Sequence, residues 1–501
     1  MRFFLVFNFF FFLGIHSILG QLSVPKFFTD NMVLQRDKAV HLWGKGNPDT
    51  FLKVQFGEET VTARVGQDSN WSILLKKRRA NPNPQSILIT HRQQKIMLAN
   101  ILIGDVWLCI GQSNMEWPME KEMHFEKEVK KANRPLLRFY NPSYAGKSIY
   151  NEIFTDSVLR LLGKKDFYMG KWQVSDSNSV RKMSAVGYYF AKELLEKKHV
   201  PIGLINMAIG EAPIETFVAV KAMENHPKFT RKAKGNWLTN EELPVWIRER
   251  GHQNVGKIPV IHHDELGPNH AFKPGFAFAA GIEPMAQMPI KGILWYQGES
   301  NAQEPERVYE YAELQKSMIE DYRKQWKQHE MPFYWAQLSS IDSSRYKSRY
   351  WPQFRNKQRK LLEEIDYGGM AVTSDIGAKN DVHPTNKKDV GNRLARWALN
   401  NVYSHGIMPS GPLPYSAVYK DGKVVVSYEY SDGLTSSDGK PLRGFSLDGK
   451  NSVKADIQKD KIVIPTVRKP KFLYYAWRPW SDANLVNVEK LPASTFKLKV
   501  E

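Results

Sequence analysis

One serine of this 501-residue sequence lies where an apolar run passes into a polar loop. The segment 104–116 reads GDVWLCIGQSNME, so the apolar run ends at Gly111 and Ser113 follows two residues later. Serine hydrolases of the α/β type place the nucleophile at the carboxyl end of a strand, after a tight turn. Its backbone N–H then lies beside the reacting carbonyl and donates to the oxyanion. Because a lone serine at such a position is more often a helix N-cap, its chemical meaning depends on partners elsewhere in the chain.

A histidine with a nearby carboxylate follows far downstream. The segment DVHP, residues 381–384, stands between a glycine-containing loop and a helical pattern. A serine hydroxyl is a poor nucleophile until an imidazole takes its proton, and a carboxylate on the other ring nitrogen orients that imidazole. We therefore predict Ser113 as nucleophile, His383 as general base and Asp381 as the orienting acid. Asp375 is a rival for the last role.

Two further residues are candidates for binding the oxyanion. Gly210 follows the apolar run PIGLINMA, and a glycine N–H can approach a substrate closely. Asn301 ends the segment WYQGESN, and its carboxamide donates without carrying a charge. One such donor is worth roughly 3 kcal/mol in the transition state. Each is weak evidence alone, since asparagine and glycine are also common in turns.

The elements that must position these residues alternate between strands and helices. Between 101 and about 400, strand-like apolar runs occur at 105–110, 201–208, 292–297, 333–338 and 370–375, and helical patterns at 181–199, 306–328, 352–365 and 386–402. This alternation predicts a parallel sheet with helices on both faces. An irregular stretch at about 219–275 is expected to be an insertion near the substrate site, because ligands of open α/β sheets bind beyond the carboxyl ends of the strands.

Short alternating segments flank this region on both sides. Before residue 100 they include VHLWG, FLKVQF and WSILL, which predicts antiparallel strands and a β-sandwich. After Gly411 similar segments return, with DG turn signals between them. We therefore expect an N-terminal β module over 21–100, an α/β domain over 101–404 and a C-terminal β module over 405–501. Whether the two β segments pack together is left open by the pattern.

The first twenty residues, MRFFLVFNFFFFLGIHSILG, are typical of a secretory signal. One Arg precedes an apolar run that is too short to span a bilayer, and small residues stand near its end. No later stretch approaches the roughly 20 apolar residues of a membrane helix. We expect export to the periplasm or the extracellular space, with the mature chain beginning near Gln21.

Charge and cysteine content limit the classes of ligand and the kinds of cross-link that the chain can have. The 71 Lys and Arg against 52 Asp and Glu give a net charge of +19, which favours acidic partners such as sialylated or uronic-acid glycans. The basic residues are scattered and form no nucleic-acid-binding motif. Cys109 is the only cysteine, so no internal disulfide can form. The segment HHDE at 262–265 has the composition of a metal site, but adjacent side chains diverge, and we expect no metal there.

Three motif blocks in a fixed order resemble those of the sialate O-acetylesterase-like carbohydrate esterases within the SGNH hydrolases. The blocks are GQSNMEWP, WYQGESNA and DVHPTNK. The likeness extends upstream to FTDNMVLQRDKAVHLWG and downstream to YAWRPWSDANLVNVEKLPASTF, so it covers essentially the whole chain after the first twenty residues. The resemblance implies an α/β fold: a flavodoxin-like SGNH-hydrolase domain with a parallel sheet, joined to jelly-roll-like β-sandwich modules. It implies no metal and no organic cofactor.

The resemblance also implies roles for individual residues. It assigns the nucleophile, the oxyanion donors and the acid/base pair to Ser113, Gly210, Asn301, Asp381 and His383. It makes Gln112, Gln297 and Glu299 pocket residues that either orient a sugar hydroxyl or brace the loops. The carboxylate stands two residues before the histidine, whereas the wider superfamily often uses three, and in some related esterases a backbone carbonyl orients the imidazole instead.

The second block departs from its relatives. They commonly read GGTPIEAW where this chain reads GEAPIETF at 210–217. The glycine needed for the oxyanion is kept, but Glu211 places a carboxylate near the pocket. This carboxylate argues against an anionic sialoside as substrate unless a nearby Arg or Lys balances it.

We therefore predict a serine esterase that removes O-acetyl groups from sugars. The first candidate substrate is 9-O-acetylated sialic acid, and acetylated xylan or another polysaccharide is the alternative. A non-catalytic carbohydrate-binding surface protein is the alternative of another class, against which the joint presence of Ser113, Asn301, Asp381 and His383 argues. A lipid esterase of the same superfamily is disfavoured by the sugar-esterase motifs.

Overall fold

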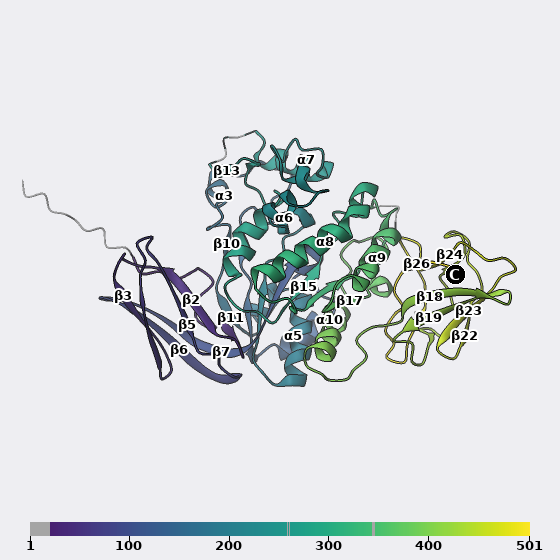
Figure 1. Cartoon of the computed structure of the whole chain (residues 1–501), viewed down its shortest axis with the longest axis horizontal. Coiled ribbons are helices and arrows are strands. Elements are labelled where there is room, and N and C mark those ends of the chain that lie inside the picture. Colours follow the sequence, from purple (N-terminus) through teal and green to yellow (C-terminus); the bar gives the residue numbers. More distant parts are fainter. Residues whose placement is uncertain (1–20, 258, 260, 343–345) are drawn as a thin grey trace, which may run out of the picture.

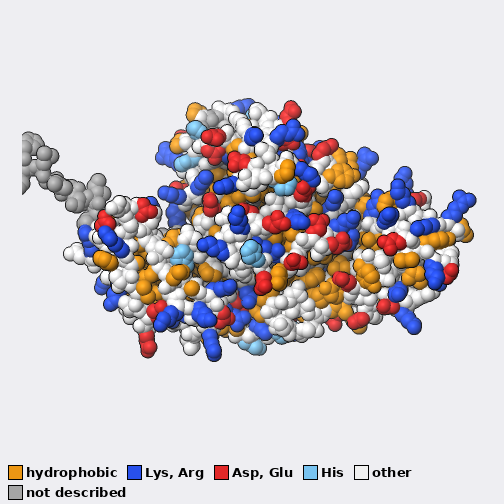
Figure 2. Space-filling view, viewed as in Figure 1, with side chains coloured by type: hydrophobic (Ala, Val, Ile, Leu, Met, Phe, Trp, Pro, Cys, Tyr) orange, Lys and Arg blue, Asp and Glu red, His pale blue; other side chains and the backbone are white. Residues whose placement is uncertain are grey.

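The computed structural model of the chain has an α/β region in the middle and a β-rich segment at each end (Figure 1). It describes residues 21–257, 259, 261–342 and 346–501, and the expected secretory signal at 1–20 lies outside the described residues. Within these ranges, no helix is both long and apolar enough to cross a membrane. Figure 2 shows Lys and Arg side chains spread over all three parts of the visible face rather than gathered in one patch.

The central sheet is parallel except at one edge. Its strands lie in the order β11-β8-β12-β7-β15-β16-β17, and only β11 is antiparallel to its neighbour. The bounds are β7 Gln94–Gly111, β8 Arg134–Tyr140, β11 Trp172–Ser175, β12 Ile202–Asn206, β15 Gly292–Tyr296, β16 Phe333–Ala336 and β17 Gly368–Ala371. Leaving β8 and β11 aside, the other five have the spatial order 2-1-3-4-5, which places the topological switch point between β7 and β15.

All five apolar runs predicted as strands are strands of this sheet. Every residue of β12 and of β15 is buried, as expected of parallel strands covered on both faces. The prediction missed β8 and β11. Both carry weaker signals, because β8 begins with Arg134 and Pro135, and β11 has only four residues.

Helices cover both faces of the sheet, so the predicted α/β class is confirmed. Tyr334 and Trp335 are consecutive in β16 and therefore point to opposite faces. The Tyr334 hydroxyl lies 3.5 Å from the carbonyl oxygen of Trp397 in α10, whereas the Trp335 indole donates to the carbonyl of Gln358 in α9 at 3.2 Å. Helices α5 and α10 pack together on one face and α8 and α9 on the other. Their bounds are α5 Ala185–Lys198, α8 Pro305–Gln325, α9 Trp351–Lys360 and α10 Lys388–Asn401.

The N-terminal β segment is continuous with the central sheet. The long strand β7 runs through the expected boundary at residue 100; its first half pairs with β6 and, further on, with β1, and its second half with β12 and β15. Buried residues from Leu22 onward belong to the same hydrophobic core as the α/β region. The other strands are β1 Val33–Gln35, β2 Val40–Lys45, β3 Phe51–Phe56, β4 Glu59–Arg64, β5 Asn70–Leu75 and β6 Asn81–His91.

The C-terminal β segment has a hydrophobic core of its own. It lies at the opposite end of the molecule from the N-terminal strands, so the two β segments do not pack together (Figure 1). The buried side chain of Arg355 in α9 ties it to the α/β region by donating to the carbonyls of Ala476 and Arg478. Its strands are β18 Leu413–Lys420, β19 Lys423–Glu429, β20 Thr435–Ser436, β21 Phe445–Ser446, β22 Asp456–Gln458, β23 Lys461–Pro465, β24 Phe472–Tyr475, β25 Leu485–Val486 and β26 Phe496–Lys499.

Short elements surround the carboxyl ends of the strands. The expected insertion at 219–275 contains α6, α7 and the small pair β13 and β14, and together with α3 it forms the upper part of the molecule in Figure 1. The bounds of the short elements are α1 Ser113–Glu116, α2 Phe125–Glu128, β9 Ser143–Tyr144, α3 Asp156–Arg160, β10 Tyr168–Met169, α4 Ser179–Lys182, α6 Val220–Glu224, α7 Val245–Val255, β13 His263–Asp264 and β14 Gly267–Pro268.

Candidate active site

Ser113 is the first residue of the short helix α1, directly after the end of β7. The turn between them requires glycine at position 111, whose φ is +133°. A Cβ there would lie 2.2 Å from the carbonyl oxygen of Tyr296 in the neighbouring strand. As a helix N-terminal residue, Ser113 has a backbone N–H without an intrahelical partner. No acceptor in the described part of the chain takes this N–H, so it is free to donate to a substrate oxygen.

The Ser113 hydroxyl lies within hydrogen-bond distance of the His383 imidazole. Oγ and Nε2 are 2.8 Å apart, although the residues are 270 positions apart in the sequence. The imidazole is stacked on the Trp117 indole, with ring centroids 5.2 Å apart and planes 20° apart. This contact holds the ring in the orientation that faces the serine. A neutral imidazole so placed can accept the serine proton.

Asp381, not Asp375, lies beside the imidazole. One carboxylate oxygen of Asp381 accepts a hydrogen bond from the backbone N–H of His383 at 2.8 Å and lies 3.5 Å from Nδ1. The Asp381 side chain is 59% exposed, so its charge is well solvated. Asp375 is engaged elsewhere, because both of its oxygens accept from the Arg393 guanidinium at 2.6 Å.

The surroundings keep the His383 imidazole neutral. Burial lowers the pKa of His383 below its ordinary value, and the nearby positive charge of Lys387 lowers this pKa further. Asp381 opposes both effects because a negative charge favours the imidazolium. The net pKa is lowered, so the unprotonated form needed in a general base predominates at neutral pH.

Ser113 and His383 open into a cavity of about 280 Å³. Among its walls, Trp246 and Arg250 come from α7 in the insertion, and Tyr346 comes from the loop before α9. The sequence placed the insertion near the substrate but named none of these three residues, since no motif marks them. The remaining lining residues are Gln112, Glu211, Ser300, Gln303 and Val382.

The carboxylate of Glu211 has a balancing cation. Arg250 Nη1 lies 3.2 Å from Glu211 Oε2, and the arginine side chain is only 16% exposed. The same guanidinium lies over the Tyr150 ring, 4.9 Å from its centroid. Arg250, a residue of the insertion, therefore balances the Glu211 carboxylate, so this carboxylate no longer argues against an anionic substrate.

Gly210 and Asn301 do not line this cavity. The backbone N–H of Gly210 donates to the Tyr144 hydroxyl at 3.1 Å. The Asn301 side chain donates to Glu215 Oε2 at 3.0 Å and is buried. A side chain at position 210 would crowd Glu116, since a Cβ there would lie 3.0 Å from its carboxylate. The Glu116 side chain would have to shift slightly to accept such a Cβ, and the oxyanion role of both residues stays a prediction.

The glutamines of the motif blocks brace the loops. Gln112 lines the cavity, but its side-chain oxygen accepts from the backbone N–H groups of Gly298 and Ser300 at 3.3 and 3.2 Å. Gln297 is buried and donates to Ala212 O and to Asn301 Oδ1 at 3.2 and 2.8 Å. Of the two roles open to these residues, the geometry favours bracing.

A buried polar network lies beside Ser113 and His383. Asn114 donates to Glu299 and to the carbonyl oxygen of Val382, and it accepts from the Lys387 ammonium. Burial raises the pKa of Glu299 to about 6 and lowers the pKa of Lys387 to about 7. Asn114 and Lys387 stand inside the motif blocks that carry Ser113 and His383, but no sequence signal predicted a role for either.

Side chains of the HHDE segment, residues 262–265, contact other groups of the protein. His262 Nε2 lies 3.1 Å from the carbonyl oxygen of Arg160, and Asp264 forms an ion pair with Lys273 at 2.5 Å. Across the described residues, no group of three or more His, Cys, Asp or Glu side chains is arranged to hold a metal ion.

Comparisons with known proteins show which proteins this chain is similar to. Residues 277–400 match the sequence profile of a family described as carbohydrate esterase, sialic acid-specific acetylesterase. The sialate O-acetylesterase of Homo sapiens is 26% identical over 427 residues, which cover 77% of this chain and 72% of that protein. The enzyme of the same name from Mus musculus is 25% identical over 455 residues, covering 82% and 80%. The crystal structure of a carbohydrate acetylesterase from Xanthomonas citri has a TM-score of 0.75 and 27% identity, and the match covers 96% of this chain and 100% of that one.

The fold and these relatives define the chain as a carbohydrate esterase of the SGNH type. More particularly, residues 277–400 match the sialic acid-specific acetylesterase family, and the chain is similar to sialate O-acetylesterases over most of its length.

Proposed function

We propose that the protein removes acetyl groups from sugar hydroxyls by acyl transfer to water. Ser113 Oγ attacks the acetyl carbonyl while His383 Nε2 takes the serine proton, and the imidazolium returns that proton to the sugar oxygen as the C–O bond breaks. Water then attacks the acetyl-enzyme, His383 takes the water proton, and acetate leaves as Ser113 regains a proton. The 2.8 Å contact between Ser113 and His383 at the switch point of the sheet carries this proposal.

The oxyanion of each tetrahedral intermediate needs donors. The free backbone N–H of Ser113 is the first, and one such donor contributes roughly 3 kcal/mol. Gly210 and Asn301 are proposed as the others. The Gly210 N–H would exchange the Tyr144 hydroxyl for the substrate oxygen, and the Asn301 carboxamide has a second N–H besides the one bonded to Glu215.

Two substrate classes are proposed. O-acetylated sialic acid comes first, because four mammalian relatives of this chain carry the name sialate O-acetylesterase and Arg250 balances the Glu211 carboxylate at the cavity wall. Acetylated xylan or another neutral polysaccharide comes second. The Xanthomonas citri relative, whose structure matches nearly the whole chain, is named as a carbohydrate acetylesterase without a particular sugar and is compatible with either class.

We further propose that the protein acts outside the cytoplasm and that its β segments position the glycan. Export rests on the secretory-signal pattern of residues 1–20. The β segments are proposed to be jelly-roll-like sandwiches flanking a flavodoxin-like hydrolase domain. Detection of a mature N-terminus near Gln21 in the protein recovered outside the cytoplasm would support export, and recovery of the intact chain inside the cell would refute it.

The test of activity is acetate release from O-acetylated sialic acid and from acetylated xylan in parallel. The Ser113→Ala variant should lose activity by at least about 10³-fold, since it removes the nucleophile. Ser157→Ala, a change at an exposed serine on α3, is the matched control and should retain full activity. Full activity of Ser113→Ala would refute the mechanism. Absence of release from both substrates, with glycan binding retained, would favour the non-catalytic binding protein.

A further inference from the structure

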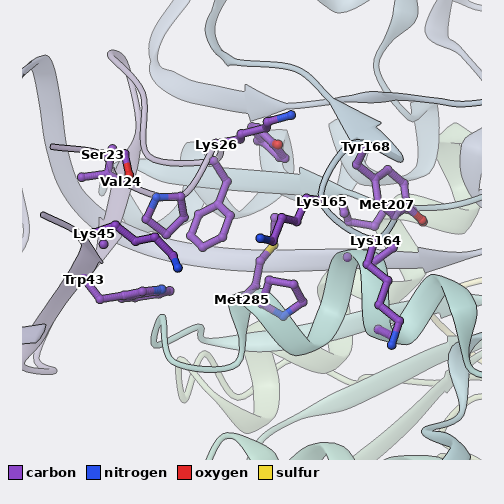
Figure 3. A pocket seen from close by; sticks show the side chains of 18 of the residues that line it. Ser23, Val24, Lys26, Trp43, Lys45, Lys164, Lys165, Tyr168, Met207 and Met285 are labelled. Atoms are coloured by element: carbon purple, nitrogen blue, oxygen red, sulfur yellow. The ribbon is translucent and has the colours of Figure 1, made fainter. Parts of the chain in front are cut away.

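A second and larger cavity lies between the N-terminal strands and the α/β region. Its volume is about 540 Å³, within the range of pockets that bind small ligands. It shares no lining residue with the cavity of Ser113 and His383. One wall comes from residues 23–27 and 43–45, and the other from 164–168, Met207 and 279–285. Figure 3 shows this cavity from close by.

An indole forms one wall of this second cavity. Trp43 is half-buried and is held in place by the edges of Phe27 and Phe28, whose ring centroids lie 5.7 and 4.8 Å from that of Trp43. Tyr168 and Met285 contribute further apolar surface on the opposite side (Figure 3). An aromatic wall of this kind packs well against the C–H face of a pyranose ring while leaving the ring hydroxyls in water.

Four lysines surround the same cavity. Lys26 is neutralised by Asp166, 2.6 Å away, and this pair is exposed. The other three are Lys45, Lys164 and Lys165, all exposed, and no carboxylate oxygen of the described residues lies within 4.0 Å of their amino nitrogens. In Figure 3, Lys45 extends toward the space above Trp43, and Lys165 extends toward Met285 from the other side. The cavity therefore combines apolar walls with three lysines that form no ion pair within the described part of the chain, of which Lys45 also interacts electrostatically with Asp68.

We propose that this cavity is a second carbohydrate-binding site, which takes a carboxylated sugar residue of an acidic glycan. The pyranose ring packs on Trp43, and Lys45 and Lys165 bind the carboxylate. A neutral sugar would form no ion pair with the lysine ammonium groups. The site would hold an acidic chain on the N-terminal side of the molecule, apart from the acetyl group at Ser113. This inference goes beyond the esterase activity and does not depend on it.

Binding is measured by isothermal titration calorimetry of the purified protein with trigalacturonate, with xylotriose as the neutral probe and decanoate as an apolar anion. Trigalacturonate should bind, and xylotriose should bind at least about tenfold more weakly. Added salt should weaken the binding of trigalacturonate and leave the binding of xylotriose unchanged. The double change Lys45→Gln/Lys165→Gln should weaken trigalacturonate binding at least about tenfold, as should Trp43→Ala. Lys53→Gln/Lys95→Gln, at two exposed lysines of the same N-terminal sheet, is the matched control and should bind normally.

Other outcomes would overturn the proposal. Equal binding of xylotriose and trigalacturonate would show that the lysines do not select for acid. Tighter binding of decanoate, lost in the Trp43→Ala variant, would assign the cavity to an apolar anion instead. Trigalacturonate binding that survives the lysine changes but is lost in Arg250→Gln would place the acidic sugar in the catalytic cavity. Ser113→Ala should retain this binding whether or not the esterase mechanism is correct, so the two proposals fail separately.

Discussion

Replacing Asp381 by Asn should lower kcat/KM about fivefold. The change removes the negative charge beside His383 while keeping a side-chain oxygen that accepts the backbone N–H of His383, 2.8 Å away in the wild type. The loop is therefore expected to keep its shape. What is lost is the stabilisation of the imidazolium that forms as Ser113 attacks.

The magnitude follows from distance and exposure. Two unit charges 4 Å apart interact by about 1 kcal/mol in water and by about 4 kcal/mol near a protein surface of lower effective dielectric. Asp381 lies 3.5 Å from Nδ1 and is 59% exposed, so the lower figure applies. Since about 1.4 kcal/mol corresponds to tenfold in rate, an interaction of about 1 kcal/mol gives an expected loss of about fivefold. A buried triad carboxylate, by contrast, is worth about 10⁴-fold.

The assay is the pH dependence of kcat/KM for acetate release by wild type, Asp381→Asn and the control Asp375→Asn. Because Asp381 raises the pKa of His383, its removal should also move the acid limb of the profile to lower pH. Asp375→Asn alters an ion pair with Arg393 away from the imidazole and should leave the acid limb unmoved.

Two results would refute this reasoning about Asp381. A loss above about 10³-fold would mean that the carboxylate is buried against Nδ1 when substrate is bound, unlike in the structure. An unchanged rate together with an unmoved acid limb would mean that another group, such as a backbone carbonyl, orients the imidazole.

Three further predictions concern the groups around the site. Lys387→Met should move the acid limb of kcat/KM, which in the wild type lies below pH 6.5, to higher pH, because a charge that lowers the pKa of His383 is lost; a limb that stays or falls would contradict this. Glu215→Ala should cost about 1–3 kcal/mol of unfolding free energy in urea titrations, since buried Lys232 keeps only Glu310 as a carboxylate partner and the buried Asn301 amide loses its acceptor. Glu313→Ala at a surface pair should cost under about 1 kcal/mol, and equal costs would refute the distinction. Arg250→Gln should raise KM for O-acetylated sialic acid more than for acetylated xylan, and equal effects on both would argue against a cationic contact with the sialic acid carboxylate.

The central sheet was predictable because its strands and helices carry strong periodic signals. Helix α10 buries Val390, Leu394, Trp397 and Ala398, which recur at helical spacing, and β15 is apolar throughout. The continuity of the N-terminal β segment with the α/β region across residue 100 was harder to predict. Strand β7 has an alternating first part and an apolar second part, so two patterns meet inside one strand without any turn signal between them.

The contact between Ser113 and His383 was predictable from motif and chemistry, whereas the cavity walls were not. Ser113 and His383 stand in recognisable blocks. Trp246, Arg250 and Tyr346 come from irregular segments in which no spacing rule links residue type to position. Their proximity to Ser113 depends on how the insertion folds back over the sheet, which is a matter of tertiary packing and is not encoded in any local pattern.

The strand order explains why residues so distant in the sequence form one site. Strand β7 is hydrogen-bonded to β12 on one side and to β15 on the other, with Cys109 opposite Asn206 and Gly111 opposite Tyr296. The loops that leave these three parallel strands therefore emerge at one edge of the sheet, and Gln112 ties two of them together through Gly298. His383 arrives from a fourth segment, which the carbonyl of Val382 anchors on Asn114, the residue after the nucleophile. The distance between Ser113 and His383 is thus set by a side chain that performs no chemistry. A change at Asn114 should accordingly impair turnover through geometry rather than through loss of a reacting group.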